Sequence, residues 1–518
     1  MSRVPLWSPV SLKLAPYNRE ASPRPAPARS RLIADTSLPT TTNTEAPPVI
    51  ARLAADQRAV VDTLATAFAQ DGHELYLVGG VVRDILLERE TPADLDLATS
   101  ATPEQVKAIA ARLDHQGLYD VGERFGTIGI VFAGEGGPRP VEITTYRSER
   151  YEPGSRHPDV IYGDSIGDDL ARRDVTINAI AVDIRDGAIV DPYYGRADLA
   201  MGLLRAVGDP DERFREDPLR LLRVARFVSQ LGFAVEARTR AAMRRQAATI
   251  ETVSAERILA EITRLLCGEY VDHGLETLLV SGLLGRAMPE LMPLEDSVDA
   301  YAGAHREKDL WQHTKRVVAQ SPPRPVVRWA ALLHDAAKPL TRSVDAQGEV
   351  HFFGHERVGA DLARRLLDRL KADKSTRIAV TRLVDMHLRC ASYDAATWTD
   401  SAVRRLALEA DGIMPDLLDL AAADVTSANA RKQRAAANRV RGLRDHLARL
   451  EAELALDQLQ SPLDGNDLMR MFDRRPGKWI AEVKDHLREL VIDGELAPDD
   501  CETASRIAQD LVTAMDAE

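Results

Sequence analysis

The pattern of apolar and polar residues changes character near residue 210. Before this point, stretches with the 3.6-residue period of a helix alternate with short apolar runs of strand length, and after it nearly all of the periodicity is helical. The expected helices are 51–70, a helix that begins at residue 81, and 103–113; the expected strands are 75–78, 94–98, 127–132, 140–146 and one within 176–184. We therefore expect an α+β fold, with a mixed α/β head followed by an all-helical remainder.

Composition divides the chain further. Residues 1–48 hold nine of the 28 prolines and show no apolar periodicity, so we expect a disordered N-terminal extension there. The head is expected from about residue 50 to 205, where helix and strand patterns alternate.

Composition and charge also exclude some classes of protein. The hydrophobic fraction of 45% is ordinary for a globular chain, and no run approaches the roughly 18 apolar residues of a membrane span. The three cysteines share no Cys-x-x-Cys spacing, which fits a reducing cytoplasm. The net charge of −13 argues against a protein that coats nucleic acid, although an enzyme that binds RNA can be acidic if its basic residues cluster.

The first chemical motif lies where a strand, a glycine turn and a helix meet. Gly79 and Gly80 end the strand 75–78, and a glycine turn that opens a helix presents backbone N–H groups to an anion. On the next strand, Asp94 and Asp96 are expected on one face, because alternate residues of a strand point the same way. Two adjacent carboxylates are costly without a cation, so the motif predicts a triphosphate site that uses a divalent metal.

A third carboxylate, Glu142, lies on the strand 140–146. If this strand lies beside the strand of Asp94 and Asp96, Glu142 completes a metal-binding triad; the alternative is an edge-strand glutamate paired with Arg147. Three carboxylates and two Mg²⁺ ions suit in-line attack on a phosphate, and magnesium is the natural ion for all-oxygen ligation.

A basic motif follows at residues 169–179. Its adjacent arginines, Arg172 and Arg173, could hold phosphates, while Asp174 and Asn178 could bind ribose hydroxyls. For this motif taken by itself, a surface arginine–aspartate pair is the favoured interpretation.

A helical motif at 216–226 offers a donor beside an acceptor. Asp217 and Arg220 are three apart and are expected on one helix face, which Arg223 extends. Such a pair matches the amino group and ring nitrogen of cytosine and adenine and rejects guanine and uracil. The commoner meaning of this spacing is an i,i+3 salt bridge.

In their order along the chain, these motifs resemble the class II tRNA nucleotidyltransferases, the CCA-adding enzymes of the polymerase β superfamily, which are related to bacterial poly(A) polymerases. The resemblance covers residues 50–518. It implies a nucleotidyltransferase head over 49–207, a base-recognising neck over 208–290, a body over 291–455 and a tail over 456–518. By this resemblance Asp94 and Asp96 bind catalytic Mg²⁺, and Glu142 matches a family strand carboxylate. The nucleotide-binding residues that it implies are Gly79, Gly80, Arg83, Arg172, Asp174, Asn178, Asp217, Arg220, Arg223 and Arg226.

The segment 147–159 matches the family's flexible loop, and its polar, Pro- and Gly-containing composition predicts a mobile surface loop. In the family this loop helps to switch specificity from C to A, which argues against an enzyme that adds only C. The stretch 122–129 lacks the Arg-Arg-Phe or Lys-Arg-Phe motif and the following histidine that poly(A) polymerases tend to carry.

The body carries a spaced set of histidines and aspartates that resembles the HD domain of metal-dependent phosphohydrolases. By this likeness His313, His334, Asp335 and Asp424 bind a divalent transition metal, and His355 and His387 hold a second ion or a phosphate. Lys338 would contact phosphate. The alternative is a degenerate HD fold kept as a scaffold.

A basic helical segment at 428–450 is a candidate contact for the tRNA backbone, although a solvated face is the usual meaning of such a run. The residues expected to bind RNA are Arg431, Lys432, Arg434, Arg439 and Arg441.

The resemblance therefore implies a template-independent, Mg²⁺-dependent enzyme that adds or repairs the 3′-terminal CCA of tRNA from CTP and ATP. It would act in the cytoplasm, away from membranes and without an obligate protein partner, and its HD domain leaves a phosphohydrolase activity open. Two alternatives stay open: a bacterial poly(A) polymerase, and an HD metal phosphohydrolase whose head merely binds RNA.

Overall fold

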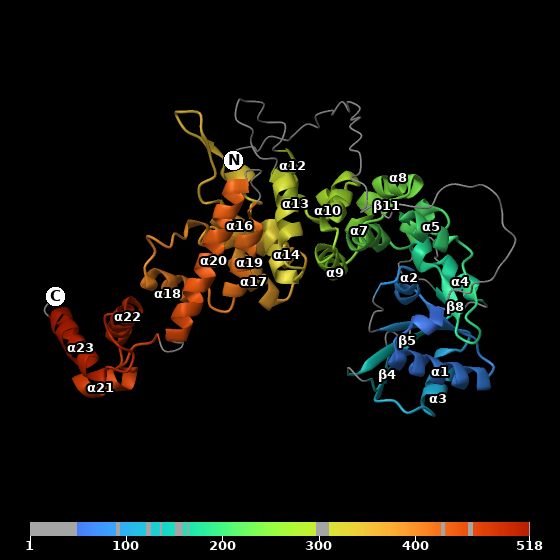
Figure 1. Ribbon diagram of the computed structural model, residues 1–518, viewed down its shortest axis with the longest axis horizontal. Helices are drawn as coiled ribbons and strands as arrows, with labels where there is room; N and C mark the ends of the chain where they lie inside the picture. The colour runs from blue at the N-terminus through green and yellow to red at the C-terminus, as the bar shows by residue number, and fades with distance from the viewer. Residues whose placement is uncertain are drawn as a thin grey trace, which may run out of the picture. The chain divides into compact units, whose positions relative to one another are not determined.

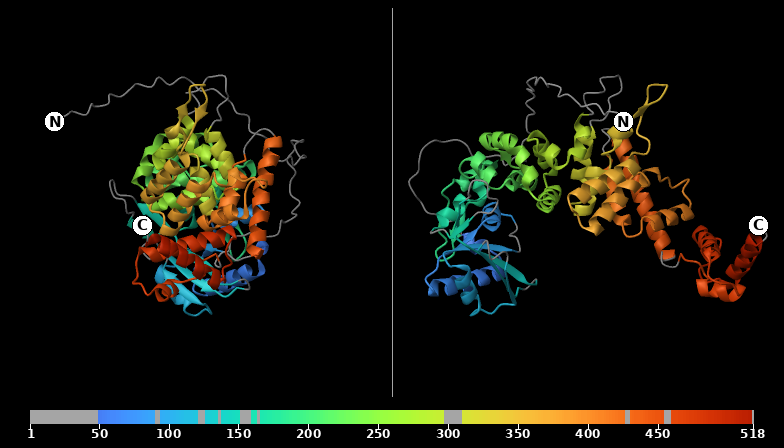
Figure 2. Two further views of the ribbon diagram at one scale, coloured as in Figure 1. Left: turned by 90° about the vertical axis from the view of Figure 1, so that its left-hand side faces the viewer. Right: turned by 180° about the vertical axis from the view of Figure 1, so that it is seen from behind.

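The computed structural model describes residues 49–89, 94–120, 126–134, 137–150, 159–162, 165–296, 310–425, 430–453 and 459–516. They belong to one compact unit, Pro48–Glu518. The expected disordered extension 1–48 and the centre of the expected mobile loop, 151–158, lie outside the described residues. Figure 1 shows a mixed sheet early in the chain, in blue to cyan, and mainly helices after it, and Figure 2 shows the same from two other directions. The expected α+β class is confirmed.

The head is built on a seven-stranded sheet in the order β3-β4-β5-β2-β1-β8-β9. Its strands are β1 (Leu75–Val78), β2 (Leu95–Thr99), β3 (Gly117–Asp120), β4 (Thr127–Phe132), β5 (Arg139–Thr145), β8 (Ala181–Asp183) and β9 (Ile189–Val190). Neighbouring strands are antiparallel except β2 and β5, which are parallel. A parallel pair needs a long crossover, and here α3 (Pro103–Ala110), β3 and β4 provide it.

Alternation along β2 and β5 gives the sheet one buried and one polar face. Leu95, Leu97, Val141 and Ile143 are fully buried against α1 (Ala55–Gln70) and α3, which cover that face (Figure 1). The residues between them, including Asp96, point to the opposite face. Burial of the apolar face fixes the register, since a slip of one residue would turn every side chain over.

The head contains several further elements outside the seven-stranded sheet. They are η1 (Val49–Arg52), α2 (Gly80–Leu86), the hairpin β6 (Arg147–Arg150) with β7 (Asp159–Tyr162), α4 (Ile166–Ala171), η3 (Thr176–Asn178), α5 (Gly195–Met201) and β10 (Leu203–Leu204), which pairs with β11 (Ala234–Val235). Both ends of the expected mobile loop therefore form a β-ribbon.

The strand predicted within 176–184 is confirmed, but it occupies only the second half of that range. Residues Thr176–Asn178 form a 3-10 turn, and the strand β8 begins only at Ala181. The side chain of Asp174 accepts hydrogen bonds from the backbone of Val175 and from the amide of Asn178, which closes a local turn in place of a ladder. The strand β3 was not predicted, because its sequence lacks a clear alternation.

The helical region after the head contains α6 (Pro210–Glu216), α7 (Leu219–Leu231), α8 (Ala237–Gln246), η4 (Ala247–Thr252), α9 (Ala255–Leu266), α10 (Val271–Val280), α11 (Leu283–Ala287), η5 (Pro289–Leu291) and α12 (Met292–Asp296). Helix α7 is buried along most of its length between α9 and α10. Helix α10 packs closely against α7 because Gly274 faces Ser229 of α7. A Cβ atom added to Gly274 would lie only 2.6 Å from the Ser229 Cβ.

The body contains α13 (Leu310–Gln320), α14 (Pro325–Leu333), α15 (Lys338–Thr341), the hairpin β12 (Ser343–Val344) with β13 (Val350–His351), α16 (His355–Arg369), α17 (Lys374–Met386), η6 (Cys390–Ser392), α18 (Asp400–Glu409), α19 (Met414–Ala423) and α20 (Ala430–Glu453).

The tail contains α21 (Gly465–Phe472), α22 (Lys478–Asp493) and α23 (Cys501–Met515). The tail has its own apolar core, which includes the buried side chain of Trp479. Across the described ranges, no helix combines the length and apolar character needed to cross a bilayer.

The contact between Gly274 and Ser229 generates a stability prediction. In a Gly274→Ala variant α7 and α10 must move apart, so we expect a loss of about 1–3 kcal/mol, seen as a lower midpoint of chemical denaturation. Gly167→Ala is the matched control: this glycine is also helical, but its Cβ would meet nothing closer than 3.5 Å, so the midpoint should stay or rise. Equal midpoints for the two variants would contradict the packing argument.

Candidate functional site

Three carboxylates gather on the polar face of the head sheet. Asp96 of β2 is the direct register partner of Glu142 of β5, and Asp94 immediately precedes β2. Desolvation and the charges of Asp96 and Asp94 raise the pKa of Glu142. Desolvation also raises the pKa of Asp96, with Asp94 adding to the shift and Arg173 opposing it. The strand of Glu142 thus lies beside that of Asp96, and the mutual repulsion and all-oxygen donor set suit a hard divalent cation.

The glycine turn brings the backbone directly against these acids. Gly79 has φ +77°, and a Cβ atom here would lie 3.3 Å from Asp96 Oδ2 and 3.2 Å from Arg173 Nη1. The position therefore needs glycine for its backbone conformation and for its close approach. Arg173 thus lies beside both the turn and Asp96, although the sequence singled it out only as one of two adjacent arginines.

Both adjacent arginines are oriented by one buried carboxylate. Asp169 accepts from Arg172 Nη2 at 2.5 Å and from Arg173 Nη2 at 2.9 Å. Burial of Asp169 would raise its pKa, but the two guanidinium groups outweigh burial and lower it. Asp169 thus holds two cations beside the carboxylate face, a positioning role that the sequence did not reveal.

Four of the predicted nucleotide-binding residues form one hydrogen-bonded chain. Arg83 of α2 donates to Asn178 Oδ1 at 2.9 Å, and Asn178 Nδ2 donates to Asp174 at 3.1 Å. Arg223 of α7 pairs with the other oxygen of Asp174 at 2.6 Å. Although burial opposes ionisation, Arg223 and Asn178 hold the pKa of Asp174 well below its usual range. The chain therefore connects α2, η3 and α7.

The expected arrangement of Asp217 and Arg220 on one helix face is corrected. Helix α7 begins at Leu219, and Asp217 lies in extended backbone before it, where its Oδ1 accepts the Leu219 N–H at 3.1 Å. Asp217 pairs with Arg257 at 3.1 Å, whereas Arg220 pairs with Glu216 at 2.6 Å. The intervening proline explains the break, since a helix readily begins at proline and does not continue through it.

Arg220 nevertheless lies beside the head site. Its Nη2 donates to the backbone carbonyl of Arg172 at 2.8 Å, so the start of α7 is joined to the arginine pair. Arg223 also opposes the raised pKa of Asp96, which places the two in electrostatic contact. The carboxylate face and the predicted base-reading helix are therefore neighbours.

Arg226 is the predicted nucleotide-binding residue that the geometry supports least. Its side chain is buried, pairs with the buried Glu261 of α9 at 2.6 Å and lies over the Phe227 ring, with its guanidinium carbon 4.1 Å from the centroid. A guanidinium held in this way stabilises the packing of α7 on α9.

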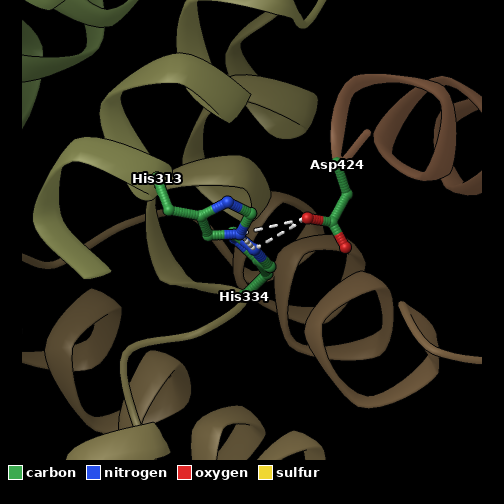
Figure 3. A group of neighbouring side chains, drawn as sticks. All are labelled: His313, His334 and Asp424. Carbon is green, nitrogen blue, oxygen red and sulfur yellow. Dashed lines mark hydrogen bonds and ion pairs between the residues drawn. The ribbon is translucent and has the colours of Figure 1, made fainter. Parts of the chain in front are cut away.

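A second cluster lies in the body. His313 of α13, His334 after α14 and Asp424 after α19 point toward one another (Figure 3), with Nε2 of His313 3.2 Å from Nε2 of His334 and 3.1 Å from Asp424 Oδ1. Asp335 Oδ2 lies 3.2 Å from His313 Nε2 and 3.3 Å from His334 Nε2. About 3.4 Å is the spacing expected for two donors that each lie ~2.1 Å from one tetrahedral ion, close to these distances.

A further group of ligand atoms shares Asp335. Its Oδ1 faces His355 Nε2 at 3.4 Å and His387 Nε2 at 3.8 Å, and these two nitrogens lie 3.3 Å apart. Among the described residues Asp335 Oδ1 is buried and has no hydrogen-bond partner. A buried carboxylate oxygen without a hydrogen bond, facing two imidazole nitrogens, fits the ligand set of a cation. Asp335 therefore stands between two sets of donors, His313–His334–Asp424 and His355–His387.

The orientation of the histidines fits metal ligation. In three of them Nδ1 lies 2.6–2.8 Å from the backbone carbonyl three residues earlier: His334 with Ala331, His355 with Phe352 and His387 with Val384. A carbonyl can only accept, so Nδ1 carries the proton and Nε2 turns its lone pair inward when the ring is neutral. Burial lowers the pKa of His387 to about 4, which keeps this ring neutral.

The carboxylates of the cluster also favour a positive charge beside them. Burial alone would lower the pKa of His334, but the carboxylates of Asp335 and Asp424 raise it to about 10. Lys338 Nζ lies 2.7 Å from Asp335 Oδ2, at the edge of the same cluster. A mixed nitrogen and oxygen donor set suits a divalent transition metal.

The predicted RNA-binding residues lie on α20. Arg431, Arg434, Arg439 and Arg441 are exposed, and the side chain of Lys432 lies outside the described residues. Two other basic residues of α20 pair with acids on neighbouring helices of the body: Arg444 pairs with Asp419 at 2.5 Å and Arg449 pairs with Asp400 at 2.6 Å. The basic run is thus divided between an exposed first part and a second part that holds the helix in place.

Three protein-family models match parts of the chain. Residues 75–205 match the poly A polymerase head domain, 232–294 match the probable RNA and SrmB-binding site of polymerase A, and 270–429 match the HD domain.

Individual relatives agree with the family models. The chain is 40% identical over 238 residues to the CCA-adding enzyme of Leuconostoc citreum, a match that spans only about half of that relative's length, 56%. It is 31% identical over 431 residues to the CCA-adding enzyme of Geobacillus sp. strain WCH70, which covers 82% of this chain and 91% of the relative. A crystal structure of the Bacillus stearothermophilus CCA-adding enzyme in complex with CTP is similar with a TM-score of 0.65 at 26% identity, covering 90% of this chain and all of that one. The chain therefore belongs to the family of CCA-adding enzymes.

Proposed function

We propose that this protein adds or repairs the 3′-terminal CCA of tRNA from CTP and ATP, without a nucleic-acid template. The observation that carries the proposal is the register of β2 and β5, which sets Asp96 beside Glu142 with Asp94 one residue before the strand. The family supports it, because relatives along most of the chain are CCA-adding enzymes and the solved Bacillus stearothermophilus relative binds CTP.

In the proposed reaction the 3′ hydroxyl of tRNA attacks the α-phosphate of CTP or ATP, a new phosphodiester forms, and pyrophosphate leaves. Mg²⁺ held by Asp94, Asp96 and Glu142 would activate the attacking hydroxyl and stabilise the leaving oxygen. The backbone N–H groups after Gly79 and the guanidinium of Arg173 are placed to bind the triphosphate beside these acids.

Residues on the elements next to the carboxylate face would recognise the sugar and the base of the incoming nucleotide. The chain of Arg83, Asn178 and Asp174 presents donors and acceptors suited to ribose hydroxyls. For Asp217 and Arg220 to pair with a base, each must release its present partner, and their hydrogen-bond pattern then accepts cytosine or adenine. The exposed arginines of α20 would contact the tRNA backbone, which gives affinity without sequence choice.

The cellular setting is part of the proposal. We propose that the protein works in the cytoplasm; the three free cysteines, Cys267, Cys390 and Cys501, agree with a reducing compartment. No obligate protein partner is needed, since the proposed site is assembled within this chain.

The activity prediction is direct. With Mg²⁺, CTP and ATP, purified protein should add C and then A to tRNA that lacks its CCA end. With labelled GTP or UTP supplied singly, it should incorporate no nucleotide. Asp96→Asn should lower incorporation by roughly 1,000-fold or more, because it removes a charge from the metal-binding set.

Asp335→Asn is the matched control, since it alters a buried aspartate of the other cluster and should leave incorporation unchanged. Absence of C and A incorporation by the wild-type protein would refute the proposal, and a long A tail would instead identify a poly(A) polymerase.

We propose in addition that the body cluster is an active HD phosphohydrolase centre. The specific support is Asp335, whose two oxygens face two sets of histidines while Oδ1 is buried without a hydrogen bond. A divalent transition metal bound there would supply an activated water and polarise a phosphate ester. Lys338 is placed to neutralise a phosphate at the edge of the cluster.

The metal prediction separates the two centres. Protein dialysed against Ni²⁺ or Mn²⁺ and desalted should retain metal by elemental analysis and should hydrolyse bis(p-nitrophenyl) phosphate. His334→Ala should lose at least ~90% of both the retained metal and the hydrolysis, since it removes an inward-facing ligand, while Asp96→Asn keeps both. Wild-type protein that retains no more metal than His334→Ala would show that the cluster is a scaffold.

A further inference from the structure

One row of register partners crosses four strands of the head sheet. Tyr119 of β3 pairs with Gly129 of β4, Gly129 pairs with Glu142 of β5, and Glu142 pairs with Asp96 of β2. Directly opposed residues of neighbouring strands point to the same face. Tyr119 therefore shares the polar face with the carboxylates, two strands away from Glu142.

The glycine in this row lets the tyrosine ring reach toward the acids. A Cβ atom on Gly129 would lie 2.3 Å from Cζ, 2.5 Å from Cε2 and 2.6 Å from Cε1 of Tyr119. The ring thus covers the place that a side chain at residue 129 would occupy, next to Glu142. Desolvation and the charges of Glu142 and Asp94 raise the pKa of the Tyr119 phenol, which agrees with this placement. The side chain is still 39% exposed.

The order of the strands indicates on which side of Asp96 the nucleotide and the tRNA hydroxyl would lie. The groups placed for the incoming nucleotide lie on the β1 and β8 side of Asp96: the Gly79 turn follows β1, and Asn178 precedes β8. In phosphoryl transfer the attacking and leaving oxygens are roughly in line, on opposite sides of the phosphate. The attacking hydroxyl must then approach from the β5, β4 and β3 side, where Tyr119 lies.

We propose that Tyr119 is a positioning residue that stacks on the 3′-terminal nucleotide of the tRNA acceptor end. This inference rests on the proposed function and deepens it by assigning the acceptor side of the site. Stacking on an aromatic ring is tolerant of base identity, because every base has a π-face. That property suits an acceptor whose last residue changes with each addition, whereas hydrogen bonds to base edges would not.

The test compares steady-state constants for the two substrates. Tyr119→Ala should raise KM for tRNA lacking its CCA end by about 10-fold and leave KM for CTP within about 2-fold, while Tyr119→Phe, which keeps the ring, should resemble the wild type. Leu118→Ala is the matched control: Leu118 is on the same strand and equally exposed at 39%, but it points to the other face. Circular dichroism of each variant checks that the fold is kept.

Gly129→Ala provides a second route to the same readout, because its Cβ would displace the ring while leaving Tyr119 in the chain. It should also raise KM for tRNA. The inference is overturned if KM for CTP rises in place of KM for tRNA, if Tyr119→Phe is as impaired as Tyr119→Ala, or if neither constant changes while the wild type incorporates C and A. Wild-type protein that incorporates neither nucleotide overturns the proposed function itself.

Discussion

Repulsion among three carboxylates on one sheet face is the constraint that organises the head. The parallel pairing of β2 with β5 sets Asp96 beside Glu142, and each raises the cost of ionising the other. Such a face is stable only if positive charge is close at hand. The surrounding elements supply it: the glycine turn and the guanidinium of Arg173 both lie close to Asp96.

These cations are held by carboxylates of their own. Asp169 is fully buried and orients both Arg172 and Arg173, and Asp174 orients Arg223. Breaking a buried pair leaves an uncompensated charge, so these supporting acids fix the guanidinium groups in place. A site that binds a polyanion needs cations that are already oriented, because less side-chain entropy is then lost on binding.

Helix α7 connects this site to the rest of the chain through three arginines spaced three residues apart. Each has a different partner: Arg220 contacts Glu216 and the Arg172 carbonyl, Arg223 contacts Asp174, and Arg226 contacts Glu261 of α9. The spacing places them near one face, but the elements that pack around α7 differ along its length. Similar residues at a regular interval therefore have different surroundings: Arg220 and Arg223 contact residues next to the carboxylate face, and Arg226 lies within the packing of α7 on α9.

The sequence by itself determined the fold class, the family, and the residue types of the carboxylate cluster in the head and the histidine–aspartate cluster in the body. Strands such as Leu75–Val78 and Thr127–Phe132 were predictable because local hydrophobic alternation fixes them, and the ordered motifs identified the family. The tertiary structure alone decided which residues meet. Neither the partnership of Asp96 with Glu142 nor the two-sided contact of Asp335 is visible in the spacing, because pairing register and helix convergence depend on long-range packing. For the same reason the helix start after Pro218 separated Asp217 from Arg220, and Tyr119 came to lie beside Glu142 only because Gly129 on the strand between them has no side chain.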